Sequence, residues 1–175
     1  MDDFNNRSRK MNYGAFINPN GIHDDIVDIT RSWWTLKLLP KVIHRITLDK
    51  IRPMTYKASD HLYYQPDKSF DSDLGSIPAF LQPFFPKDQF RSAYIMHDSE
   101  YTHGGVWVSS WGHGPFVFQK TSQVKADDRL HDMIMALDPQ SNITANLIWS
   151  GVRLGGWASW CKGDRKKKEQ HDTRY

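Results

Sequence analysis

The residues best suited to chemistry lie together in one segment, where His97 and Asp98 are adjacent and Tyr101 follows three residues after Asp98. The surrounding sequence, FRSAYIMHDSEY, reads as a helix, so these polar groups share it with apolar residues. Burying a polar group without a partner costs roughly 2–7 kcal/mol. Proteins accept that cost mainly for metal binding, for proton transfer, or for a network in which every polar group is paired. The segment therefore predicts one of these three roles.

Two predicted helices position these side chains. The first runs over residues 89–101, and the second runs over residues 122–137. Helical spacing puts one apolar stripe on the first helix, through Phe90, Ala93, Tyr94, His97 and Tyr101. On the second helix, Asp127 lies with the apolar residues and His131 borders them. In an antiparallel helical hairpin, the inner faces oppose His97, Asp98 and Tyr101 to Asp127 and His131.

These opposed faces define the candidate site. The candidate catalytic residues are His97, Asp127 and Tyr101, and the candidate metal ligands are Asp73, His97, Asp98 and Asp127, with Asp71 nearby. Imidazole and carboxylate ligands suit Zn²⁺ or Ca²⁺, and such an ion can turn water into a nucleophile. Without a metal, a carboxylate that fixes the tautomer of His97 makes the imidazole a general base. The alternative is a structural network, because a single buried histidine or aspartate is commonly just a satisfied hydrogen-bonding group.

The rest of the chain predicts an α+β fold. Residues 41–50 and 54–64 are strand candidates, expected to form a small antiparallel sheet packed on the helix pair. Residues 102–121 hold four glycines and four large aromatic residues and predict a hairpin or flap. A C-terminal helix is expected over residues 142–160. We expect an extended N-terminal arm over residues 1–40, one domain over residues 41–161, and a basic flexible tail over residues 162–175.

Composition excludes several classes of protein. The chain has 175 residues and a net charge of +3, with much of the basic excess in the C-terminal tail, so no specific nucleic-acid binding is predicted. The single cysteine, Cys161, excludes an intramolecular disulfide and a cysteine-rich zinc site. The N-terminal residues lack an apolar segment, so no secretory signal is predicted. The most apolar stretch, residues 143–161, contains Arg153 and is not expected to span a membrane.

The order of these motifs resembles a small family of unknown function, family 1353, found in phages and prophages. The matching residues are Phe70, Asp73, Ser76, Ile77 and Pro78, then Ala93, His97, Asp98 and Tyr101, then Ala126 and Asp127, and finally Val152, Arg153 and Gly155 or Gly156. The likeness covers roughly residues 44–160. Two positions depart from the family pattern, because Ser72 stands where threonine is usual and Gln123 stands where arginine is common.

The helix pair is also similar to the active-site hairpin of secreted phospholipases A2. That resemblance implies that His97 is the base, that Asp98 binds Ca²⁺ and that Asp127 orients the histidine. The disulfides of that family cannot form with one cysteine, and its glycine-rich calcium loop is not evident here. The likeness therefore concerns geometry rather than activity.

Two functions follow as expectations. The first is a phage-associated hydrolase, metal-assisted or histidine-based, that acts on a cell-envelope substrate such as peptidoglycan and is carried on the tail or baseplate. The second is a structural virion protein whose polar cluster is a buried network or a structural metal site. In both cases we expect synthesis in the host cytoplasm and association with other virion proteins.

Overall fold

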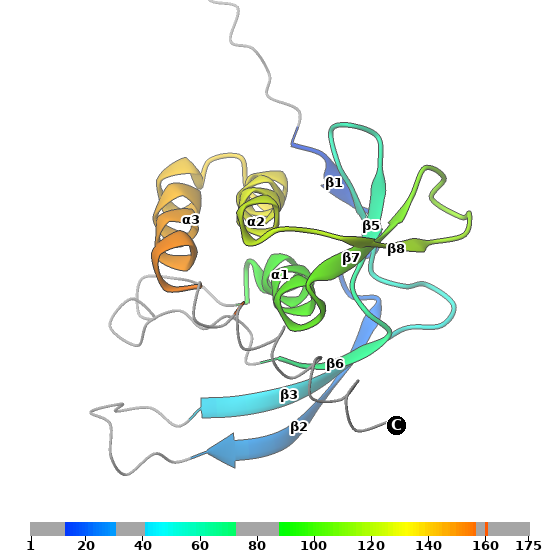
Figure 1. The fold of residues 1–175 in the computed structure, drawn as a ribbon, viewed down its shortest axis with the longest axis horizontal. Helices are drawn as coiled ribbons and strands as arrows, with labels where there is room; N and C mark the ends of the chain where they lie inside the picture. Colours follow the sequence, from blue (N-terminus) through cyan, green and yellow to red (C-terminus); the bar gives the residue numbers. More distant parts are fainter. Residues whose placement is uncertain (1–12, 31–40, 73–87, 157–159, 161–175) are drawn as a thin grey trace, which may run out of the picture.

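The structure is a computed structural model, and it describes residues 13–30, 41–72, 88–156 and 160. The described chain has the expected α+β fold, with two antiparallel sheets and three helices (Figure 1). None of the described helices is long and apolar enough to cross a lipid bilayer. Asp73 and the Ser-Ile-Pro motif lie outside the described residues, as does the predicted basic tail.

The larger sheet has five strands, in the order β1-β4-β5-β7-β8. These strands are β1 (Ala15–Phe16), β4 (Tyr56–Lys57), β5 (Tyr63–Gln65), β7 (Gly105–Ser109) and β8 (Val117–Lys120). The antiparallel pair β7–β8 confirms the hairpin predicted within residues 102–121. Residues 54–64 form β4 and the start of β5 instead of one strand. The chain reverses between them at His61, whose φ of 69° is left-handed, and at Asp60, whose carboxylate accepts from the Leu62 amide at 3.0 Å.

The smaller sheet has three strands, in the order β2-β3-β6. They are β2 (Ile22–Thr30), β3 (Lys41–Leu48) and β6 (Ser69–Ser72). The strand predicted over residues 41–50 is confirmed as β3, but it pairs with β2 and β6 rather than with residues 54–64. Within the expected N-terminal arm, Ala15–Phe16 form β1 of the larger sheet and Ile22–Thr30 form β2 of the smaller one.

The three helices end where local chemistry allows. Helix α1 (Arg91–His103) stops at Gly104, whose φ of 64° is the left-handed conformation that glycine adopts most readily. Helix α2 (Gln123–Leu137) begins after Ser122, whose side chain accepts from the Lys125 amide at 3.4 Å. Helix α3 (Asn142–Gly155) is the predicted C-terminal helix, and Trp160 is again helical beyond the undescribed residues 157–159.

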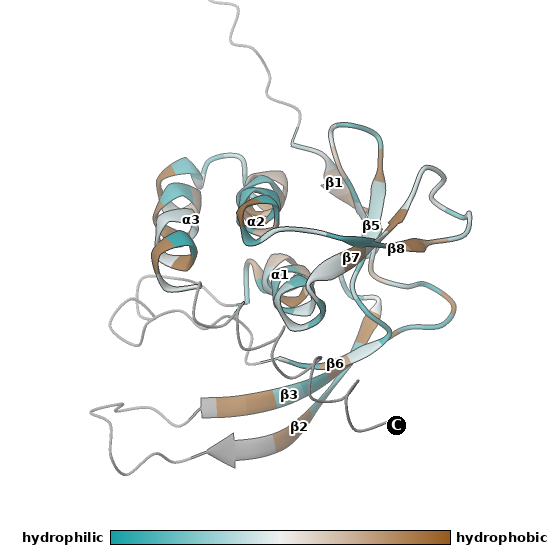
Figure 2. Ribbon diagram, in the orientation of Figure 1, coloured by the Kyte–Doolittle hydropathy of each residue, from teal (hydrophilic) through white to brown (hydrophobic). Residues whose placement is uncertain are grey.

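Helix α1 is the centre of the core. It contacts α2 on one side and strands β6 and β7 on others, and Figure 1 shows it between α2 and the three-stranded sheet. Helix α1 therefore carries buried side chains on several sides, whereas the sequence predicts a single apolar stripe. The largest fully buried side chains include Phe90, Ile95 and Met96 near or in α1 and Leu130, Met133 and Ile134 of α2. Figure 2 shows that much of β3 is hydrophobic, consistent with the burial of Ile46.

Candidate functional site

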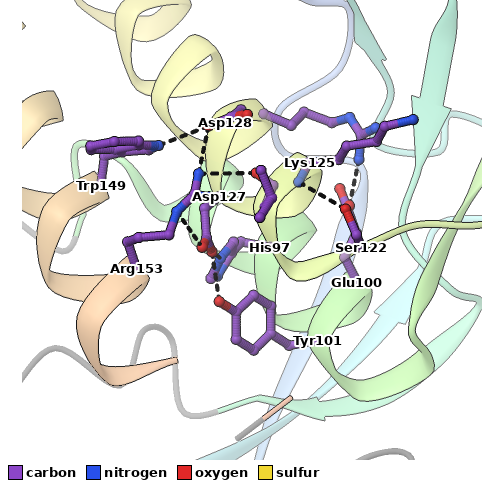
Figure 3. A network of polar contacts seen from close by, with 11 residues as sticks. His97, Glu100, Tyr101, Ser122, Lys125, Asp127, Asp128, Trp149 and Arg153 are labelled. Atoms are coloured by element: carbon purple, nitrogen blue, oxygen red, sulfur yellow. Dashed lines mark hydrogen bonds and ion pairs between the residues drawn. The ribbon is translucent and has the colours of Figure 1, made fainter. Parts of the chain in front are cut away.

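The carboxylate of Asp127 is the centre of the candidate site. It projects from α2 toward α1 and is fully buried, with an exposed fraction of 0%. His97 and Tyr101, four residues apart on α1, both reach its Oδ1 atom (Figure 3). The Nε2 atom of His97 lies 3.0 Å from Oδ1, and the Tyr101 hydroxyl donates to it at 2.6 Å. The structure thus brings together the three predicted catalytic residues, because His97, Tyr101 and Asp127 occupy the facing stripes of the two helices.

These contacts fix which nitrogen of neutral His97 carries the hydrogen. An ionised carboxylate only accepts hydrogen bonds, so Nε2 must be the donor and Nδ1 must carry the lone pair. Within the described part of the chain, no residue hydrogen-bonds Nδ1. The tautomer of His97 therefore presents a basic nitrogen on the side away from Asp127.

Tyr101 is held as a donor by its surroundings. Its ring packs on the His97 imidazole, with ring centroids 4.2 Å apart, and meets the Trp160 ring edge-on at 5.1 Å. Burial raises the pKa of Tyr101, and its hydrogen bond to Asp127 raises that pKa further, while Gln123 and Arg153 oppose the shift. The phenol consequently keeps its proton near neutral pH. Gly156 gives the hydroxyl room, because a Cβ atom there would lie 2.3 Å from it.

Arg153 of α3 places a positive charge next to the Asp127 carboxylate. Its Nε atom lies 3.2 Å from Oδ2 of Asp127, and its Nη2 atom lies 2.7 Å from Oδ1 of the neighbouring Asp128. The motif comparison placed Arg153 in a Val-Arg pair but gave it no role. Helical spacing alone did not predict this contact, because it depends on how α3 packs against α2.

A second buried ion pair lies beside the site and was missed. Glu100 is fully buried and bonds Arg129 through Oε2, whereas its Oε1 atom has no partner among the described residues. Burial raises the pKa of Glu100, and the charge and hydrogen bond of Arg129 oppose that shift. The Arg129 guanidinium also lies over the Tyr64 ring, 4.3 Å from its centroid. The sequence does contain a signal for this pair, because Glu100 follows His97 by three residues and so lies near it on the helix.

The other predicted site residues lie elsewhere. Asp98 accepts a hydrogen bond from Ser72 of β6 at 2.5 Å. It does not face α2 as His97 does, because neighbouring residues on a helix point about 100° apart. His131 pairs with Asp132 of its own helix at 3.7 Å, and Asp71 forms an exposed ion pair with Arg45. Among the described residues, which exclude Asp73, no three histidine, cysteine or acidic side chains form a group able to hold a metal.

A further histidine and carboxylate meet at the three-stranded sheet. Nδ1 of His44, on β3, lies 2.8 Å from Oδ1 of Asp24, on β2. Arg91, the first residue of α1, bonds the other oxygen of Asp24. All three side chains are partly exposed, by 18% for His44, 19% for Asp24 and 34% for Arg91. No local pattern predicts this cluster, because Asp24 and His44 meet through the pairing of β2 with β3 and Arg91 reaches them from α1.

Comparison with known proteins gives one match. The model of a family described as a protein of unknown function, DUF1353, matches residues 47–152. That range contains His97, Asp127 and most of the elements around them. No curated protein and no solved structure matches the chain.

Proposed function

The chain belongs to DUF1353, a family of unknown function, and we propose that it is a hydrolase in which His97 is the general base. The proposal is based on the side chains around Asp127. The observation that carries the proposal is the fully buried carboxylate that binds Nε2 of His97 at 3.0 Å. A carboxylate in this position orients the imidazole and stabilises its protonated form.

The proposed reaction begins with a water molecule at Nδ1 of His97. Nδ1 takes one proton from the water as the oxygen attacks the electrophilic atom of the substrate, and the imidazolium that forms is stabilised by Asp127. The imidazolium then returns the proton to the leaving group, so the histidine is neutral again when the bond has broken. General acid–base catalysis of this kind contributes typically about 10²–10⁴-fold.

The substrate and setting follow from the motif order, which resembles a phage and prophage family. We propose a cell-envelope substrate such as peptidoglycan, with the protein carried on the tail or baseplate and bound to other virion proteins. A hydrolase on a virion would be made in the host cytoplasm with the other components of the particle.

The predicted metal ligands lie on two different sides of α1, with Asp127 on the side of α2 and Asp98 on the side of β6. Asp127 does not fit a ligand role, because its Oδ1 atom already accepts two hydrogen bonds and its Oδ2 atom faces a guanidinium at 3.2 Å. A cation beside Arg153 would be repelled. With His97 assigned as the general base, Asp98, which is turned toward β6, and Asp73 are the remaining proposed ligands for Zn²⁺ or Ca²⁺. Elemental analysis of the purified protein tests this part, and no step at His97 depends on it.

The hydrolase is tested by release of dye from labelled host cell walls. His97→Gln should abolish release while leaving the far-ultraviolet circular dichroism spectrum unchanged. His131→Gln is the matched control, because His131 lies on α2 and pairs with Asp132 rather than with the site. Full release by folded His97→Gln would overturn the proposal.

A second candidate is a structural virion component. It is favoured by apolar side chains on the outer face of α3, where Ile143 is 78% exposed and Leu154 is 86% exposed; Figure 2 shows hydrophobic segments along this helix. In this role the network around Asp127 only stabilises the fold. Absence of cell-wall release by the wild-type protein, with the protein present in purified virions by mass spectrometry, would favour it.

A further inference from the structure

The two oxygens of Asp127 have different partners. Oδ1 accepts from both His97 and Tyr101, whereas Oδ2 makes no directed hydrogen bond to any described residue. The atom facing Oδ2 is Nε of Arg153, at 3.2 Å, and it too is buried and lacks a directed hydrogen bond. Among the described residues, the ion pair with Arg153 is therefore the polar contact of Oδ2 (Figure 3).

Charge balance gives this contact its importance. An ionised carboxylate with no exposed surface is costly unless it is paired. In their neutral forms, His97 and Tyr101 supply hydrogen bonds to Asp127 but no opposite charge. The other partly buried arginine beside the site, Arg129, is paired with Glu100. Arg153 thus supplies the positive charge that faces the buried carboxylate of Asp127.

The outer side of Arg153 is also held in place. Its Nη2 atom donates to Asp128 at 2.7 Å and to the carbonyl oxygen of Val124 at 3.2 Å. Trp149, one turn earlier on α3, donates from its indole nitrogen to the same Asp128 oxygen at 2.9 Å. The Arg153 guanidinium lies over that indole, 4.9 Å from the ring centroid. These contacts hold the guanidinium with its Nε atom 3.2 Å from Oδ2 of Asp127 (Figure 3).

We propose that Arg153 is a positioning residue for His97: it holds the Asp127 carboxylate, and through it the hydrogen-bonded orientation of the imidazole. This inference rests on the proposed function and makes α3 part of the catalytic apparatus. Arg153 itself touches neither His97 nor the reacting water, so its effect on the reaction passes through Asp127.

The test is proton nuclear magnetic resonance of the full-length protein, assigned with His97→Gln. The wild-type protein should show a downfield Nε2–H resonance from His97, protected from exchange by Asp127. In Arg153→Gln this resonance should broaden or vanish through faster exchange, and hydrolysis should fall by up to about 100-fold, because a small misplacement of a catalytic group has effects of that size. Arg153→Lys, which keeps the charge, should restore part of both.

Arg45→Gln is the matched control, because it breaks an exposed arginine–aspartate pair between β3 and β6 that shares no residue with this network. It should leave the resonance and the rate unchanged. An unaltered resonance in Arg153→Gln, or no such resonance in the wild type, would overturn the inference. If Arg153→Gln does not fold, Arg153→Lys decides the question by the same two readouts. Full hydrolysis by His97→Gln would instead refute the proposed function and leave the resonance result standing.

Discussion

The described part of the chain contains two clusters in which an arginine, an aspartate and a histidine meet, and they differ chiefly in the burial of the aspartate and the histidine. At the helix pair, Asp127 is fully buried and the His97 side chain is 7% exposed. At the three-stranded sheet, Asp24 and His44 are 19% and 18% exposed. The bonded nitrogen also differs, being Nε2 in His97 and Nδ1 in His44. Similar residues thus form a dehydrated arrangement in one place and a solvated one in the other.

Burial decides what each cluster can contribute. Ion pairs with access to water contribute typically 0.2–1 kcal/mol, because water and salt screen them. A buried carboxylate interacts more strongly with its neighbours, but removing one partner leaves an uncompensated polar group and costs about 3–5 kcal/mol. The cluster around Asp24 therefore links α1 to the three-stranded sheet, whereas the cluster around Asp127 has the burial and the hydrogen bonds that the proposed proton transfer requires.

The largest expected difference between the clusters concerns hydrolysis. Asp127→Asn should lower cell-wall hydrolysis by about 10²–10⁴-fold, because an amide can donate to Nε2 of His97 and stabilise the wrong tautomer. Asp24→Asn should leave the rate unchanged. Both rates are measured by dye release at equal concentrations of folded protein. Equal losses in the two variants would remove the functional distinction.

Stability should separate the clusters next. Asp127→Ala should lower the free energy of unfolding by about 3–5 kcal/mol, since it leaves the buried donors of His97 and Tyr101 unpaired. Asp24→Ala should lower it by about 1 kcal/mol or less. Urea unfolding followed by tryptophan fluorescence gives both values. A loss for Asp24→Ala as large as that for Asp127→Ala would show that burial is not the deciding variable.

Removal of one hydroxyl sharpens the account of the buried cluster. Tyr101→Phe removes a donor to Asp127 while keeping the ring on His97, so it should cost about 1.5–3 kcal/mol, the usual contribution of a hydrogen bond to a charged group. The same urea experiment measures it. No change in stability would mean that the hydroxyl is not bonded to the carboxylate in solution.

The smallest expected effect is a dependence on pH. Because the pKa of Glu100 is raised above its ordinary value of 4.5, the folded protein holds this proton more tightly than the unfolded chain does. The stabilisation is complete below pH 4.5 and is lost as the pH rises through the folded pKa. The stability of Glu100→Gln relative to wild type should therefore increase as the pH rises above 4.5. Urea titrations between about pH 4 and 7 measure this difference, and a constant difference would contradict the assignment.

Local spacing accounts for the part of the site that could be predicted. A stripe of period 3.6 put His97 and Tyr101 on one face of α1, and the same rule put Asp127 on the facing side of α2. The rule failed for Glu100, because α1 is buried on several sides rather than along one stripe. It also treated Asp98 as a neighbour of His97 in space, although adjacent helical residues face different elements.

The fold shows the same limit. The strand at residues 41–48 was predictable from alternation, but its partners were not, because pairing with β2 and β6 depends on contacts between distant residues. The cluster of Asp24, His44 and Arg91 inherits that dependence. The role of Arg153 likewise requires the packing of α3 on α2, for which no local pattern carries a signal.

The absence of a side chain at Gly156 leaves room for the Tyr101 hydroxyl beside Asp127. A single methyl group there would claim the space of the Tyr101 hydroxyl and would also press on the Val152 carbonyl, at 2.5 Å. Replacing this glycine with alanine would thus wedge the phenol away from its acceptor without adding or deleting any charge. The end of α3 thus controls, through the volume of one side chain, the hydrogen bond that Tyr101 donates to Asp127.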